Sequence, residues 1–159
     1  MAFQYKNVYW LWISAAVIVL DQITKQLVVK SLAWFDVLPV FYGFNLVRLH
    51  NTGAAFSMFS SASPLFFVAL GVGVSLGILW WLRKNPTGHR HEAIAFTLIL
   101  GGALGNVIDR VTRGYVVDFL DFHFAGWHYP AFNVADSAIT LGAGLLIFDM
   151  VREWWRERR

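Results

Sequence analysis

Two aspartates in the last third of the chain, Asp118 and Asp136, have the residue type and the setting for acid–base chemistry. They flank the point where the chain enters its last apolar segment. The Gly114 turn and the Tyr129-Pro130 bend could fold the intervening loop back, so that the two carboxyl groups face each other. Two close carboxyl groups cannot both ionise readily, so one keeps a proton while the other acts as a base. Such a pair can activate water and protonate a leaving amine, which is what peptide hydrolysis without a metal requires.

Each of these aspartates also has a structural interpretation. Asp136 follows Asn133 by three residues, which is the spacing of a helix capping box. Asp118 taken by itself is better interpreted as a solvated loop carboxylate, and we expect the neighbouring Asp121 to be solvated or interfacial. The sequence leaves both interpretations of the pair open.

Polar residues also interrupt two earlier apolar segments, where an unpaired charge costs several kcal/mol and therefore indicates a function. Asp21 and Lys25 are four residues apart on one helix face, which favours an intrahelical ion pair that supports a site. Asn106, Asp109 and Arg110 lie within about one turn of each other. Arg110 could bind a lipid phosphate or a substrate carbonyl, or pair with Asp109 or another carboxylate.

The composition indicates an integral membrane protein. Of 159 residues, 57% are hydrophobic and 14% are charged, which excludes an ordinary soluble domain. Four segments approach the roughly 20 apolar residues that cross a bilayer: about 8–29, 64–82, 93–108 and 134–151. We therefore predict an all-α bundle of four transmembrane helices forming one domain, 1–159. The chain has no cysteine, and its net charge of +3 lies mostly at helix ends, which indicates membrane orientation and not nucleic-acid binding.

The basic residues predict how the bundle is oriented. Eight of the thirteen Lys and Arg lie near the termini and in the loop between the second and third segments (Lys6, Arg83, Lys84, Arg90, Arg152, Arg156, Arg158 and Arg159). The positive-inside rule then makes both termini cytoplasmic. The polar groups of the first, third and fourth segments would converge near the outer face, which suits a reaction at the membrane surface.

The segment 31–63, on the outer side, is rich in aromatic and β-branched residues that partly alternate, which favours short strands. The turn at 51–53 could be followed by another strand or a short interfacial helix over 54–59. We expect a small sheet that rests on the membrane surface.

Small residues predict close helix contacts in two of the spans. Gly101, Gly102 and Gly105 give one small-xxx-small pattern, and Gly73 and Gly77 give another. We expect all five to be packing residues.

Three other functions are compatible with single residue types in this sequence. His50, His123 and His128 could form a metal site, but no paired metal-ligand spacing supports one. Ser57 or Ser137 with a histidine could form a serine protease, but no nucleophile-elbow motif is present. A transporter or proton channel would normally place its charges near the middle of the bilayer, not at one face.

Five ordered motifs resemble those of the bacterial lipoprotein signal peptidases, signal peptidase II, over about residues 8–151. They are Asp21-Gln22-x-x-Lys25, Asn51-Thr52-Gly53-Ala54-Ala55-Phe56, Gly102-x-x-Gly105-Asn106-x-x-Asp109-Arg110, Val116-Val117-Asp118-Phe119 and Phe132-Asn133-x-Ala135-Asp136-Ser137.

The resemblance implies an aspartic endopeptidase of the bacterial inner membrane, with no metal or other cofactor. Such an enzyme removes the signal peptide of diacylglyceryl-modified prolipoproteins, cutting just before the lipidated cysteine. Its fold would be four transmembrane helices with an outer β-cradle and a short interfacial helix. The partners would be prolipoproteins and membrane phospholipids, with no nucleic acid, and the protein would be a monomer. The catalytic pair maps onto Asp118 and Asp136, and the lining or supporting positions are Asn51, Gly53, Asn106, Asp109, Arg110, Asn133, Ala135, Asp21 and Lys25.

Overall fold

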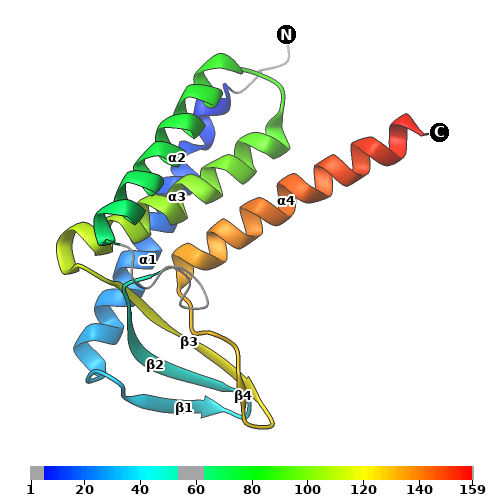
Figure 1. Cartoon of the computed structure of the whole chain (residues 1–159). Coiled ribbons are helices and arrows are strands. Elements are labelled where there is room, and N and C mark those ends of the chain that lie inside the picture. Colours follow the sequence, from blue (N-terminus) through cyan, green and yellow to red (C-terminus); the bar gives the residue numbers. More distant parts are fainter. Residues whose placement is uncertain (1–5, 54–62, 159) are drawn as a thin grey trace.

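Four long helices dominate the computed structural model, which describes residues 6–53 and 63–158 (Figure 1). They are α1 (Leu11–Ser31), α2 (Pro64–Lys84), α3 (Arg90–Arg113) and α4 (Val134–Glu157), and a short 3₁₀ helix, η1 (Asn7–Trp10), precedes α1. The α2, α3 and α4 helices and the continuous η1–α1 segment are each long and apolar enough to cross a membrane. The predicted four-helix membrane fold is therefore confirmed.

The helices run further than the apolar segments because their charged ends continue the helical backbone. The third span was predicted to be 93–108 and the fourth 134–151, whereas α3 extends to Arg113 and α4 to Glu157. The α3 helix stops at Gly114, whose φ of 81° is left-handed and favours glycine. Apolar length alone therefore underestimates both helices.

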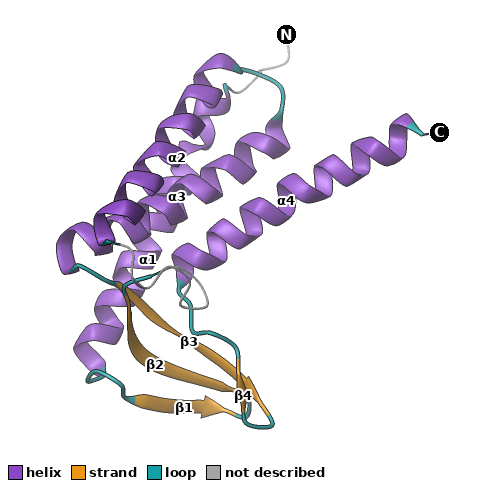
Figure 2. Cartoon of the chain, in the orientation of Figure 1, coloured by secondary structure: helices purple, strands orange, loops and turns teal. Residues whose placement is uncertain are grey.

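A four-stranded antiparallel sheet lies beside the helices (Figure 2). Its order is β1 (Val37–Phe41), β2 (Phe44–Asn51), β3 (Val116–Phe124) and β4 (Trp127–His128). The predicted sheet within 31–63 is thus only half of the real one, because β3 and β4 come from the segment between α3 and α4. The strand or interfacial helix expected over 54–59 lies outside the described residues.

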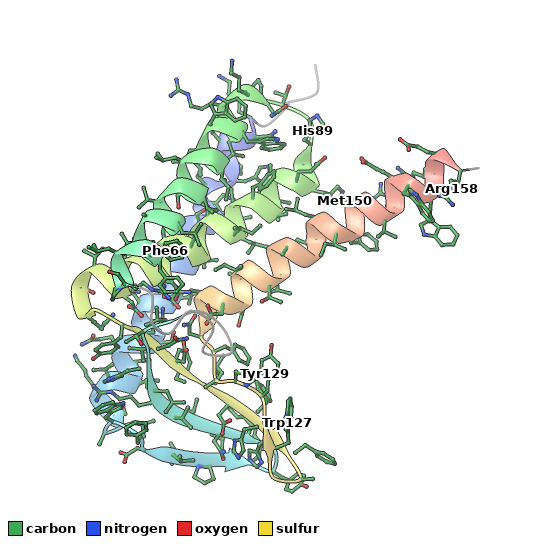
Figure 3. All side chains as sticks on the ribbon, viewed as in Figure 1. Phe66, His89, Trp127, Tyr129, Met150 and Arg158 are labelled. Carbon is green, nitrogen blue, oxygen red and sulfur yellow. The ribbon has the colours of Figure 1, made fainter. Side chains whose placement is uncertain are left out.

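The sheet lies at the opposite end of the molecule from η1 and the C-terminal end of α4 (Figure 1). We call the end where α1 and α3 finish and α2 and α4 begin the sheet end. In Figure 1 the α4 helix starts against the other helices and then diverges, so that its C-terminal half stands apart. Met150 and Arg158 lie on this separate half (Figure 3), and Met150 is 68% exposed.

One small hydrophobic cluster joins the sheet to the bundle. Val28 of α1 packs with Val117 and Phe119 of β3, and all three are buried. These two β3 residues flank Asp118, so the same contacts that dock the strand also fix the position of that aspartate.

Close helix contacts occur at one of the two predicted glycine patterns. A Cβ added at Gly101 would lie 2.8 Å from the Cβ of Val17, one at Gly102 would meet the carbonyl oxygen of Ala135, and one at Gly105 would lie 2.8 Å from Asp21 Oδ2. The prediction for Gly73 and Gly77 is wrong among the described residues: no heavy atom lies within 4 Å of either added Cβ. These two glycines of α2 face away from the bundle.

Candidate active site

Asp118 lies in the middle of β3, opposite Leu49 of β2, and is only 3% exposed. The solvated-loop interpretation of this residue is therefore wrong. Two amide side chains hold its carboxylate: Asn133 donates to Oδ1 at 2.7 Å, and Asn51 donates to Oδ2 at 2.9 Å. Burial and the negative charge of nearby Asp136 raise the pKa of Asp118 to about 7.

Asp136 lies in the first turn of α4 and does form the capping box. Its Oδ2 accepts from the Asn133 N–H at 3.3 Å, and its own N–H donates to Asn133 Oδ1 at 2.9 Å. The other oxygen, Oδ1, accepts from the Asn106 side chain at 2.8 Å. The capping role and a place beside Asp118 are therefore compatible, because Asn133 also donates to Asp118.

A fully buried ion cluster lies behind the two aspartates. Lys25 Nζ is 2.8 Å from Asp21, 3.0 Å from Asp109 and 3.0 Å from the Asn106 side-chain oxygen. The predicted Asp21–Lys25 pair is confirmed. The Ala135 N–H donates to Asp21 at 2.9 Å.

The carboxylate of Asp109, like that of Asp21, accepts a hydrogen bond from the backbone of another element. Its Oδ2 accepts from the Val117 N–H at 3.2 Å, one residue before Asp118. The ion cluster thus holds both β3 and the start of α4, the two elements that carry Asp118 and Asp136.

Arg110 does not pair with Asp109. Its guanidinium donates to the Gly53 carbonyl at 2.7 Å and lies 4.8 Å from the ring centre of Phe67. The Gly53 N–H in turn donates to the Asn51 side chain at 2.9 Å. Arg110 thereby connects α3 to the turn after β2. This turn is hydrogen-bonded to Asn51, the last residue of β2, which donates to Asp118.

Asp109 is instead paired with Arg113, one turn further along α3, and it also accepts from Gln22 at 3.1 Å. The sequence alone did not assign a role to Gln22 or to Arg113. Two signals were available: Arg113 follows Asp109 by four residues, and Gln22 lies beside Asp21 in a predicted span.

Both aspartates line one cavity of about 1040 Å³. Asn51, Asn106 and Arg110 line it as well. Apolar residues from α2 and α4 are also part of the lining and were not predicted, because in the sequence they resemble any other residue of a membrane span (Phe67, Ile139 and Leu141). The cavity therefore combines an acid–base centre with an apolar wall.

Asp121 was predicted to be solvated or interfacial, and the solvated alternative is wrong: Asp121 is 6% exposed and lies outside the cavity lining. It accepts from Asn45 at 2.8 Å and contacts His128 Nδ1 at 2.8 Å. Burial opposes ionisation of Asp121, but these two partners outweigh it and lower its pKa. Asp121 thus joins three strands of the sheet away from Asp118.

The residues of the alternative sites have other partners. His50 stacks on Tyr115, and His123 stacks on His128. Within 6–53 and 63–158, no group of three His, Asp or Glu side chains could hold a metal ion. The Ser137 hydroxyl donates to the Asn133 carbonyl at 2.9 Å, as in many helices, and Ser57 lies outside the described residues.

Comparisons with known proteins give a consistent result. The family model described as signal peptidase (SPase) II matches residues 13–152. A lipoprotein signal peptidase of Burkholderia multivorans is 52% identical over 147 residues, covering 90% of this chain and 87% of that protein. Another from Alteromonas mediterranea is 47% identical over 153 residues, covering 94% and 84%.

A solved structure described as a bacterial membrane enzyme superposes with a TM-score of 0.87 at 30% identity. The match covers 96% of this chain and 93% of that one. Since the family model and these relatives extend over nearly the whole sequence, the chain belongs to the signal peptidase II family of membrane peptidases.

Proposed function

We propose that this protein is an aspartic endopeptidase that cleaves diacylglyceryl-modified prolipoproteins immediately before the lipidated cysteine. Membership of the lipoprotein signal peptidase family supports cleavage of lipoprotein signal peptides. The observation that carries the aspartic mechanism is that Asp118 and Asp136 line one cavity, with Asn133 hydrogen-bonded to both.

The pair supplies both proton transfers that hydrolysis of an amide needs. One carboxylate takes a proton from water, and the resulting oxygen nucleophile attacks the scissile carbonyl carbon. The other carboxyl group, still protonated, donates a hydrogen bond to the carbonyl oxygen as negative charge develops there. A proton then reaches the amide nitrogen, the C–N bond breaks, and the cysteine leaves with a free amine.

The raised pKa of Asp118 supports a pair in which one carboxyl group is protonated and the other is ionised. With a pKa of about 7, its carboxyl group can hold a proton near neutral pH while its neighbour is ionised. The acid and base roles belong to the pair as a unit.

The apolar part of the cavity suits a lipidated substrate. Phe67 of α2 and Ile139 and Leu141 of α4 line the side of the cavity that belongs to the membrane-spanning helices. We propose that the signal helix lies along these helices and that the acyl chains remain in the outer leaflet. The enzyme would act as a monomer in the inner membrane, with its site at the outer face.

A cleavage assay on purified protein tests the proposal. A lipid-modified precursor peptide should be cut before its cysteine, and Asp118→Asn or Asp136→Asn should each abolish cutting in a folded protein. Loss of about 10⁴-fold or more in rate is the scale expected when an acid–base group is removed. A transporter of the same fold would make no cut.

The chain provides a matched control for this assay. Asp121→Asn changes the same residue type on the same strand, three positions from Asp118, outside the cavity lining. This variant should retain most of its activity, and a chelator should have no effect. Cleavage that survives Asp118→Asn or Asp136→Asn, or that a chelator stops, would rule out the aspartic mechanism.

A further inference from the structure

A second groove lies at the sheet end, and none of its lining residues lines the cavity. Its volume is about 430 Å³, and one residue of α3 and five of α1 line it: Arg113, and Gln22, Ile23, Gln26, Leu27 and Lys30. Two of these carry positive charge, two carry amides and two are apolar. No carboxylate lines the groove.

The two cations retain capacity for an anion. Lys30 lies in the last turn of α1, is exposed, and makes no ion pair within the described part of the chain. Arg113 pairs through Nη1 with Asp109 and donates through Nη2 to Gln26 at 3.2 Å, while its side chain stays 20% exposed. A guanidinium has five N–H donors, so these two contacts leave others for an oxyanion.

The apolar side of the groove continues along α1. Val19, Ile23 and Leu27 follow one another at four-residue spacing and are 54%, 51% and 59% exposed. Eleven residues separate Val19 from Lys30, which is about 16 Å along a helix. This length is close to half of the roughly 30 Å hydrocarbon core, the depth of one leaflet.

We propose that this groove binds one anionic phospholipid. The phosphate lies between Lys30 and Arg113, and an acyl chain follows Ile23 and Leu27 toward Val19. Charge complementarity favours an anionic lipid over a zwitterionic one, whose own amine would meet the same two cations. The site is separate from the cavity that holds Asp118 and Asp136.

Lipid titration of the purified full-length protein, followed by native mass spectrometry, tests this assignment. The probes are phosphatidylglycerol and phosphatidylcholine with the same acyl chains, and inorganic phosphate as competitor. One phosphatidylglycerol should bind in preference to phosphatidylcholine, and millimolar phosphate should not displace it. Equal binding of the two lipids, or displacement by phosphate, would overturn the proposal.

Variants at Lys30 locate the site. Lys30→Gln should weaken phosphatidylglycerol binding about tenfold, the value of roughly one charge-assisted hydrogen bond. Lys30→Arg should restore binding and Lys30→Glu should weaken it further. The matched control is Lys84→Gln, which removes the same charge from the last turn of α2 at the other end of the bundle. If Lys84→Gln reduces binding as much as Lys30→Gln, or if neither does, the groove is not the site.

Discussion

At the residue scale, the hydrogen-bond donors to Asp118 and Asp136 among the described residues are neutral amides and not cations. The side chains of Asn51 and Asn133 donate to Asp118, and the Asn106 side chain and the Asn133 backbone N–H donate to Asp136. An adjacent cation would favour full ionisation of a carboxylate far more strongly than a neutral amide does. The nearest lysine, Lys25, instead contacts the oxygen of Asn106. The pair can therefore keep one proton near neutral pH, which its proposed chemistry requires.

The hydrogen bond from Asn51 should set the alkaline limit of activity. The active pair holds one proton and loses it as the pH rises through its upper apparent pKa, which the Asp118 pKa of about 7 places near neutrality. Asn51→Ala removes a bond that favours the ionised form, so the pKa rises and the alkaline limb should move up by roughly one pH unit. Rates of peptide cleavage from pH 5 to 9 measure this. Asn45→Ala, which removes the amide from Asp121 on the same two strands, should leave the limb in place.

Asp118 should also lower the stability of the protein at high pH. Its carboxyl group has a pKa of about 7 when folded against an ordinary value of 3.8, so between these values the folded state binds more protons. Stability then falls as the pH rises through this window. Asp118→Asn should be more stable than the wild type at pH 8, by at most about 4 kcal/mol, with little difference near pH 4.

Thermal unfolding midpoints in detergent at both pH values measure the effect. Asp121→Asn should behave in the opposite way, because the folded structure lowers the pKa of Asp121 and favours its ionised form. A stability gain from Asp118→Asn that does not depend on pH would contradict this account.

Residue types alone offered Asp118 and Asp136 as candidates and left their structural interpretations open, and only the resemblance to signal peptidase II singled them out from Asp121. The difference between Asp118 and Asp121 is one of strand register: Asp118 lies opposite Leu49, whereas Asp121 lies opposite Asn45 across an irregularity in the ladder. Register between strands that are about 70 residues apart in the chain depends on tertiary contacts. A single sequence does not contain this information in readable form.

At the scale of elements, the buried ion cluster of Asp21, Lys25 and Asp109 connects helices α1 and α3 to the two elements that carry the site. Asp109 on α3 anchors the backbone of β3 at Val117, and Asp21 on α1 anchors the backbone of α4 at Ala135. Lys25 pairs with both carboxylates, and Arg113 brings the second positive charge to Asp109. Burying such charges costs desolvation free energy. In this fold the buried cluster holds β3 and α4 together, and these elements bring Asp118 and Asp136 to one place.

The contact of α3 with α4 should be intolerant of any side chain at Gly102. A methyl group there would meet the Ala135 carbonyl and lie 2.7 Å from Ile139 Cγ1, so Gly102→Ala should destabilise the fold by about 1–3 kcal/mol. The substitution should also lower the rate of cleavage, because Asp136 is the residue directly after Ala135 in α4. Gly73→Ala is the control: it lies in open space on α2 and should be neutral or slightly stabilising. Unfolding midpoints and cleavage rates of the two variants decide the matter, and similar losses would show that the contact is unimportant.

Helices were predictable from this sequence and half of the sheet was not, for a physical reason. A span needs one long apolar run, which is a local property that the sequence displays directly. The strand β3 carries two aspartates and a histidine among its nine residues, so its local composition resembles a loop. Its stability comes from pairing with β2 and from packing on Val28 of α1, both of which are contacts with distant parts of the chain.

At the scale of the whole molecule, the two ends of the bundle differ in chemistry. The sheet, the cavity and the ion cluster lie at one end, together with exposed aromatic side chains such as Trp127, which Figure 3 places on the sheet. The opposite end holds η1, the C-terminal end of α4 and most of the lysines and arginines among the described residues. Positive charge is retained on the cytoplasmic side of a membrane. We therefore propose that the sheet end, and with it the peptidase site, faces outward.

Single cysteines can test this orientation cleanly, because the chain contains none of its own. Tyr42→Cys places a thiol in the turn between β1 and β2, where the tyrosine is 81% exposed, and Thr87→Cys places one in the loop between α2 and α3. A membrane-impermeant maleimide added to cells with a permeabilised outer membrane should label the first thiol at once. It should label the second only after the inner membrane is broken, because in the proposed orientation the basic loop around it faces the cytoplasm. The reverse labelling pattern would place the cavity on the cytoplasmic side, where a signal peptidase would not meet precursors whose mature part has already been exported.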